Sequence, residues 1–116
     1  MNILITGGLG FVGTQLSLHF LGHGHQVTVV DHAPQPRPDT PTEVKYVPAD
    51  TTVPGAWQEE IQEQHAVINL AGTSIFSRWN KKTKQLIYDS RILTTRNVVE
   101  AIAAGKETLL CSTSAI

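Results

Sequence analysis

The sequence predicts an α/β fold: a doubly wound parallel sheet of five strands, in the order 3-2-1-4-5, with helices on both faces. Short runs that are mostly apolar on both faces, typical of buried parallel strands, alternate along the chain with stretches of helical periodicity. Helical crossovers join such strands into a parallel sheet, in which ligands bind at the carboxyl ends, between strands one and four. The 116 residues are expected to form one domain, 1–116, with a hydrophobic core.

The first strand and the first helix follow each other closely. The strand is expected at Asn2–Thr6, which is apolar on both faces. The helix is expected from about Phe11 to Leu21, because Val12, Leu16 and Phe20 recur at intervals of four residues. These three side chains form its predicted buried stripe.

Glycine and proline mark the other boundaries. Gly22 and Gly24 are expected to end the first helix, and four prolines within residues 33–41 predict an exposed loop. Pro54 suits the first turn of a short helix. The other strands are expected at Val27–Val30, ending at Asp31, and at Val44–Val47, Ala66–Leu70 and Thr108–Ser112, and the other helices at Pro54–Gln64 and Lys81–Ala104.

The helix over 81–104 is the longest that the sequence predicts. Its apolar and small side chains recur at helical spacing, which predicts the face that it turns toward the sheet. These side chains are Tyr88, Ile92, Thr95, Val99 and Ile102.

Three glycines, Gly7, Gly10 and Gly13, follow the first strand and open the first helix. In a dinucleotide site the first glycine permits a tight turn, the second lets a pyrophosphate approach the backbone, and the third lets the helix pack against the strand. The helix N-terminus adds unpaired N–H groups and a partial positive charge. This context predicts a dinucleotide site, with a plain tight turn as the less favoured alternative.

Acidic residues at the ends of the next two strands fit the same site. Asp31 lies about 20 residues beyond the glycines, where a carboxylate accepts the ribose 2′ and 3′ hydroxyls and repels a 2′-phosphate, favouring NAD over NADP. Arg37 either reaches a 2′-phosphate, which keeps NADP possible, or is a solvated loop charge, which we favour. Asp50 either accepts the adenine amino hydrogen or caps a turn.

Composition excludes several classes of function. The net charge of −1 and the lack of long charged runs argue against nucleic acid and anionic membranes as partners. One cysteine, Cys111, fits a reducing compartment, and the first apolar run is too short for a signal peptide or membrane span, so we expect a cytoplasmic protein. His19, His23 and His25 are expected to contact a helix end rather than a metal.

Several segments resemble the extended short-chain dehydrogenase/reductase superfamily. Its cofactor turn is similar to Thr6–Gly13, its cofactor-lining segment after strand four to Asn69–Gly72, and the start of its catalytic segment to Ser112–Ile116. The segments Ser77-Arg78-Trp79 and Ser90-Arg91-Ile92, with Thr95, resemble a subgroup of nucleoside-diphosphate-sugar epimerase-like proteins that includes a cell-division-inhibitor-like branch. The resemblance covers the whole chain and implies a Rossmann-like NAD(P)-binding domain.

The resemblance also implies roles for the matching residues. Turn amides from Leu9 to Val12 would hold the pyrophosphate, Asp31 the adenosine ribose and Asp50 the adenine, with NAD as the cofactor and NADP possible. Ser114 lies where the family has its catalytic Ser or Thr. The implied cofactor-binding residues are Gly7, Gly10, Phe11, Val12, Gly13, Asp31, Asp50, Leu70, Ala71 and Gly72.

The family's general acid/base is a Tyr-x-x-x-Lys pair after strand five, and these 116 residues contain none. Neither Tyr46 nor Tyr88 is followed by lysine four residues later. The chain therefore resembles the N-terminal part of an extended dehydrogenase/reductase, truncated before the later strands and the substrate lobe. The expected function is dinucleotide binding within an NAD(P)-dependent sugar-nucleotide epimerase/dehydratase-like oxidoreductase, with a nucleotide-sugar or other small carbonyl or carbinol substrate, and without activity alone.

Three functions stay open. The chain is either part of such an enzyme or a non-catalytic NAD(P)-binding sensor or regulatory module, and a purely structural interaction domain is a third possibility. The resemblance further implies a possible homodimer through the helix at 81–104.

Overall fold

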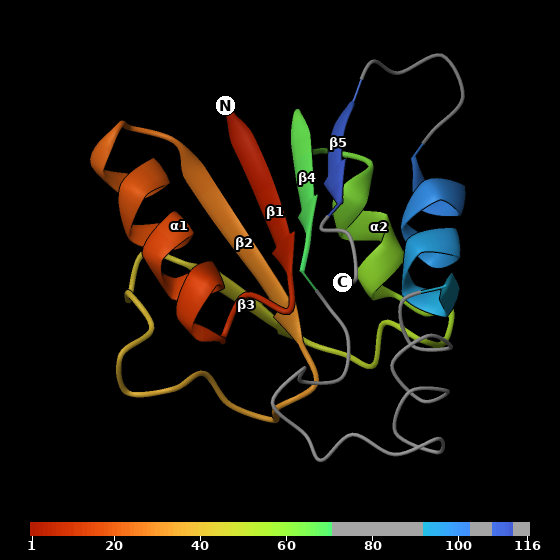
Figure 1. The fold of residues 1–116 in the computed structure, drawn as a ribbon, viewed down its shortest axis with the longest axis horizontal. Coiled ribbons are helices and arrows are strands. Elements are labelled where there is room, and N and C mark those ends of the chain that lie inside the picture. The colour runs from red at the N-terminus through yellow and green to blue at the C-terminus, as the bar shows by residue number, and fades with distance from the viewer. Residues whose placement is uncertain (71–91, 103–107, 113–116) are drawn as a thin grey trace.

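The computed structural model describes residues 1–70, 92–102 and 108–112, and its strands form one parallel sheet in the order β3-β2-β1-β4-β5 (Figure 1). The predicted fold class and strand order are confirmed. Residues 92–101 are helical. The remaining elements are β1 (Asn2–Thr6), α1 (Phe11–Gly22), β2 (Gln26–Asp31), β3 (Lys45–Pro48), α2 (Trp57–Ile61), β4 (Ala66–Asn69) and β5 (Leu109–Ser112).

β1 is the central strand, and its register aligns the strand ends on both sides. Ile3 is opposite Val27 of β2 and Ala66 of β4, and Thr6 is opposite Val30 and Asn69. All four pairings of the sheet are parallel, so the carboxyl ends of its strands lie at one edge. This edge is where a doubly wound sheet holds its ligands.

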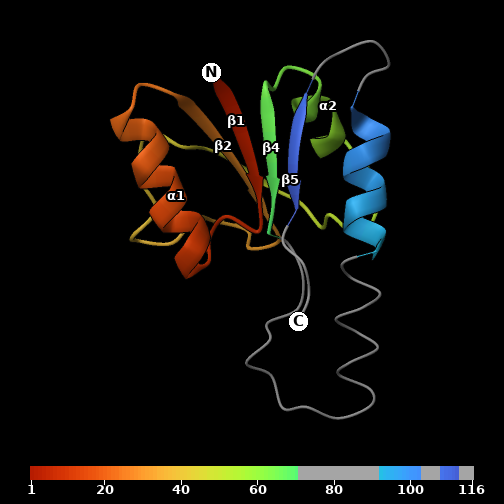
Figure 2. The same cartoon turned by 45° about the horizontal axis from the view of Figure 1, so that its top comes forward.

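Helices cover both faces of the sheet (Figures 1 and 2). On the first face, α1 packs through Leu16, Phe20 and Leu21 against the cluster of Ile3, Ile5, Leu9, Val27, Val29 and Ala66. On the second face, α2 and the 92–101 segment join one cluster that contains Leu4, Val30, Trp57, Ile61, Val67, Val98 and Ala101. In the described part of the chain, no helix combines the length and apolar character needed to cross a membrane.

The buried stripe of α1 differs from the predicted one. Val12 is 57% exposed, whereas Gly13, Thr14 and Ser17 are buried and Leu16 and Phe20 are half-buried. Small residues face the sheet because the helix begins in close contact with the turn before it, which leaves no room for larger side chains. The predicted stop is confirmed: α1 ends at Gly22, and Gly24 has a φ of +81°.

The predicted sheet-facing stripe of the 81–104 helix is confirmed at two of its four described positions, Thr95 and Ile102, and is wrong at the other two. Ile92 and Val99 are 39% and 52% exposed. The buried positions are Thr94, Asn97, Val98 and Ala101, and of the predicted stripe Thr95 and Ile102 are half-buried, while Tyr88 lies outside the described residues.

The helix predicted from Pro54 to Gln64 is shorter. α2 covers Trp57–Ile61, and Pro54 lies in the turn before it. After Ile61 the chain tightens, because the amides of Gln62 and Gln64 bond carbonyls only three residues back. The strand predictions are confirmed to within one residue at each end.

Candidate functional site

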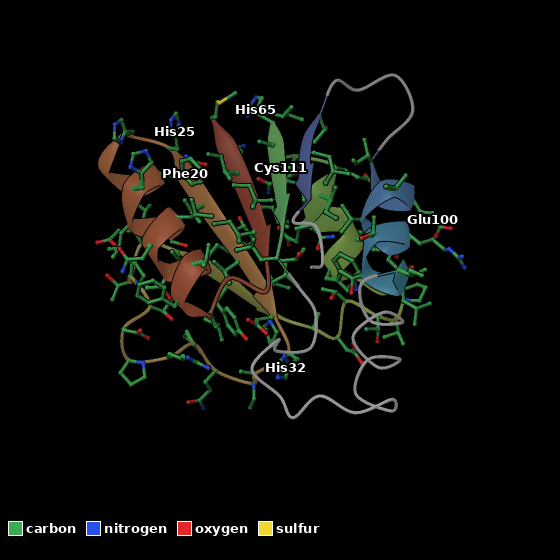
Figure 3. All side chains as sticks on the ribbon, viewed as in Figure 1. Phe20, His25, His32, His65, Glu100 and Cys111 are labelled. Carbon is green, nitrogen blue, oxygen red and sulfur yellow. The ribbon has the colours of Figure 1, made fainter. Side chains whose placement is uncertain are left out.

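The candidate site lies at the carboxyl edge of the sheet, where β1, β2 and β4 end. The glycine turn follows β1 directly, Asp31 is the last residue of β2, and Asn69 is the last residue of β4. Figure 3 shows His32, which follows Asp31, at this edge, and His25 and His65 at the opposite edge. The predicted convergence of the glycine turn and Asp31 is therefore present.

Gly7 and Gly8 form the turn itself. Gly7 has a φ of +69°, a conformation that other residues adopt only with strain, and its N–H donates to the Val30 carbonyl at 2.8 Å. A Cβ on Gly8 would lie 2.8 Å from a methyl carbon of Val29. These contacts fix the turn against β2.

Gly10 and Gly13 are glycine for different reasons. A Cβ on Gly13 would lie 2.5 Å from the Cα and the carbonyl oxygen of Gly8, so the start of α1 can approach the turn only without a side chain there. Among the described residues, a Cβ on Gly10 would meet only the Gly7 carbonyl oxygen, at 3.9 Å. Packing against these residues therefore does not require glycine at position 10, and they leave the space beside its Cα open.

No side chain of its own first turn caps or neutralises the positive N-terminal end of α1. Gly10 is the N-cap, with extended backbone (φ −71°, ψ 178°) and no side-chain cap, and the first turn contains no acidic residue. The first amides of a helix have no partner within the helix. The first turn, with Phe11 and Val12, can therefore receive an anion such as a phosphate group.

Asp31 is already hydrogen-bonded to the turn. Its Oδ2 accepts the Leu9 N–H at 3.1 Å, and its Oδ1 accepts the His32 N–H at 2.7 Å. The His32 ring adds a third contact, with Nδ1 2.9 Å from Oδ1. Leu9 was expected to offer its amide to a pyrophosphate, but here that amide serves Asp31.

Tyr46 of β3 supports the segment after β2. Its hydroxyl donates toward the carbonyls of Asp31 and Ala33. Burial, and to a smaller degree the negative charge of Asp31, raises the pKa of Tyr46 above its usual value. The phenol therefore stays protonated as a donor that holds this loop against the sheet. Sequence reasoning missed both Tyr46 and His32; for His32, its position next to Asp31 was the available signal.

Asp50 caps the turn that follows β3. Its Oδ1 accepts the Thr52 hydroxyl at 2.6 Å and the Thr52 N–H at 3.0 Å. These bonds from Thr52, with a smaller effect of His32, hold the pKa of Asp50 below its usual value. The turn-capping alternative is thus present in the structure, and the adenine contact stays a prediction.

Asn69 connects the end of β4 to its neighbours. Its Oδ1 accepts the Thr6 hydroxyl at 2.6 Å, and its Nδ2 donates to the Thr95 hydroxyl at 3.1 Å. The Leu70 N–H donates to the Thr6 carbonyl at 3.0 Å, which brings Leu70 beside the residue that precedes the glycine turn. Ala71, Gly72 and Ser114 lie outside the described residues.

Two other features singled out in the sequence are the charge of Arg37 and the cluster of His19, His23 and His25. Arg37 is exposed, and its backbone N–H bonds the Thr40 hydroxyl in a turn. His23 Nδ1 lies 2.9 Å from the His19 carbonyl in the last turn of α1, and the terminal amine lies 3.2 Å from His25 Nδ1. Within residues 1–70, 92–102 and 108–112, no three His, Cys, Asp or Glu side chains converge as metal ligands.

A family model described as the NAD dependent epimerase/dehydratase family matches residues 3–116. The epimerase family protein YfhF of Bacillus subtilis is 39% identical over 108 residues, covering 92% of this chain and 34% of that protein. The epimerase family protein SDR39U1 of Bos taurus is 33% identical over 110 residues, covering 92% of this chain and 33% of that protein. The chain thus spans about a third of the length of these relatives.

Solved structures show the same fold. UDP-glucose 4-epimerase of Thermus thermophilus, in complex with NAD, has a TM-score of 0.73 at 23% identity, covering 87% of this chain and 33% of that one. UDP-glucose 4-epimerase of Bifidobacterium longum, in complex with NAD+ and UDP, has a TM-score of 0.73 at 22% identity, with the same coverage. At these identities the likeness concerns the fold alone.

Proposed function

Because this chain belongs to the NAD dependent epimerase/dehydratase family, we propose that its 116 residues are the dinucleotide-binding part of an NAD(P)-dependent sugar-nucleotide epimerase/dehydratase-like oxidoreductase. The observation that carries the proposal is the uncapped N-terminus of α1 beside open space at Gly10. Such an N-terminus attracts a pyrophosphate, and Asp31 lies close enough to bond the same turn.

The proposed roles follow the order of groups along a dinucleotide. The turn from Gly7 to Gly13 receives the pyrophosphate, with the amides of Phe11 and Val12 as donors. Asp31 accepts the hydroxyls of the adenosine ribose, and Asp50 lies toward the adenine. Leu70, Ala71 and Gly72 continue toward the nicotinamide side, and Ser114 bonds the reacting oxygen in the larger protein.

We propose NAD as the preferred cofactor, with NADP as the weaker ligand. An ionised Asp31 beside the ribose repels a 2′-phosphate. Arg37, whose loop is exposed, is the group that would oppose this preference. The NAD held by the structural neighbours adds support.

Titration calorimetry tests the proposal directly. NAD and NADH should release or absorb heat with the 116-residue protein, and NADP and NADPH should bind more weakly. Gly10→Ala should weaken NAD binding about tenfold or more, because its methyl group enters the open space where the pyrophosphate lies. Gly22→Ala is the matched control, because a Cβ at this other end of α1 meets none of the described residues within 4 Å. Absence of binding by all four dinucleotides would refute the proposal.

Catalysis and substrate belong to the larger protein in this proposal. These 116 residues hold no Tyr-x-x-x-Lys pair, so they should bind NAD without turnover. A nucleotide sugar is the proposed substrate class, in line with the UDP held by the Bifidobacterium longum enzyme. If the coding region continues to such a pair, the enzyme is favoured; if it does not, the non-catalytic sensor or regulatory module is favoured.

We also propose a homodimer through the helix that the sequence predicts at 81–104. In its described part, the exposed apolar side chains of Ile92, Leu93 and Val99 support this role. Light scattering on a sizing column tests it: Val99→Asp should shift the protein to a monomer, and Gln15→Asp, at an exposed position on α1, should not. The cytoplasmic location expected from the sequence stays a prediction.

A further inference from the structure

His32 contacts the carboxylate that would hold the ribose. Among the described residues, the Leu9 N–H donates to Oδ2 of Asp31, the His32 N–H donates to Oδ1, and the His32 ring places its Nδ1 2.9 Å from Oδ1. A carboxylate offers about four lone-pair sites to donors. Because the ring lies against the remaining site of Oδ1, these contacts leave one site, on Oδ2, for a ligand.

The three contacts differ in how easily a ligand can replace them. The two N–H donors belong to backbone that is fixed by the glycine turn and by β2. The His32 side chain is 87% exposed, whereas the Asp31 side chain is only 13% exposed. The ring can therefore leave by rotation of its own side chain, without any change in the backbone.

A ribose diol needs two acceptor sites on Asp31, which is more than Asp31 offers while the His32 ring lies against it. Its 2′ and 3′ hydroxyls are two donors, and one free site on Asp31 serves only one of them. The ring must leave Asp31 before both hydroxyls can bond it.

We propose that the His32 imidazole is a displaceable latch on Asp31, which competes with the ribose diol of an adenine nucleotide for the same carboxylate. This inference rests on the proposed dinucleotide site, and it names a residue that limits affinity there. It identifies the diol as the ligand group that releases the latch.

Calorimetry with ADP and 2′-deoxy-ADP tests the latch. His32→Ala should bind ADP about two- to tenfold more tightly than the wild type does, the worth of one hydrogen bond. It should bind 2′-deoxy-ADP as the wild type does, because a single hydroxyl fits the free site. His23→Ala, at an exposed histidine near the opposite edge of the sheet, should change neither affinity.

The outcomes separate the latch from the site on which it rests. Equal or weaker ADP binding by His32→Ala, with binding by the wild type intact, overturns the latch alone. An equal gain for both nucleotides also overturns it, because the diol would then play no part. If neither the wild type nor His32→Ala binds ADP or NAD, the dinucleotide site itself is refuted and the latch falls with it.

Discussion

The two faces of the sheet are held by different kinds of contact. On the first face, α1 starts so close to the glycine turn that Gly13 lies against the backbone of Gly8. On the second face, the 92–101 segment adds polar contacts to its apolar ones: Thr94 bonds the Thr51 hydroxyl at 3.0 Å, and Asn97 donates to the Thr51 carbonyl at 3.0 Å.

This difference shows how each face of the sheet restrains the helix that covers it. The contact between the backbones of Gly13 and Gly8 restrains α1 against the glycine turn. The first amides of α1 therefore keep one orientation, as an anion site requires. Side-chain hydrogen bonds are directional, so they fix how the 92–101 segment is rotated, even though Ile92 and Val99 then face outward. Four substitutions test the comparison.

Gly13→Ala should have the largest effect. The added methyl carbon would lie 2.5 Å from backbone atoms of Gly8, which cannot move aside as a side chain would. We expect a loss of about 3 kcal/mol or more in the free energy of unfolding, measured with urea. Gly10→Ala, where the described residues leave space for a methyl group, should cost about 0.5–1 kcal/mol, because alanine is a poorer N-cap than glycine, and it is the control. Equal stability of the two variants would contradict the steric account of the first face.

Asn97→Ala tests the second face and should cost about 2 kcal/mol in the free energy of unfolding. The substitution leaves the buried Thr51 carbonyl without its donor and removes a side chain that is itself buried. Arg96→Ala, at the exposed neighbouring position, should change stability by less than about 0.5 kcal/mol. If Asn97→Ala were as mild as the control, apolar packing alone would hold this segment.

Thr94→Val should cost about 1 kcal/mol, because it leaves the Thr51 hydroxyl without its partner in a buried place. The shape of the side chain is nearly conserved, so the loss reports the hydrogen bond. The double variant Thr51→Val/Thr94→Val should recover part of that stability. Additive losses in this double-mutant cycle would show that the two hydroxyls do not interact.

Asp50→Asn should have the smallest effect, and only in acid. The native pKa of Asp50 lies below its usual 3.8, so the ionised form stabilises the fold above about pH 4, and this stabilisation is lost as the pH falls through the native pKa. The carboxylate is exposed, so the effect should be small. The thermal midpoint of the wild type should fall more steeply between pH 5 and 2 than that of Asp50→Asn. Parallel curves would contradict the role of the Thr52 bonds.

Sequence reasoning found the strands and the turn but not the rotation of the helices. Apolar runs and glycine spacing are local signals, and they located β1, β2, β4 and the turn at Gly7. The phase of the 92–101 segment depends on Thr94 and Asn97, which are buried because Thr51, far away in the sequence, provides partners for them. The spacing of apolar residues cannot predict that a polar side chain is buried when its hydrogen-bond partner is distant in the sequence.

The sequence by itself determined the doubly wound sheet, its strand order and the position of Asp31 at the edge that follows the glycine turn, because crossover rules and strand patterns are properties of neighbouring residues. Only the tertiary structure decided that packing among the described residues requires glycine at position 13 but not at position 10, and that the backbone N–H groups of Leu9 and His32 already bond Asp31. These facts depend on distances between segments that the chain brings together only when it folds.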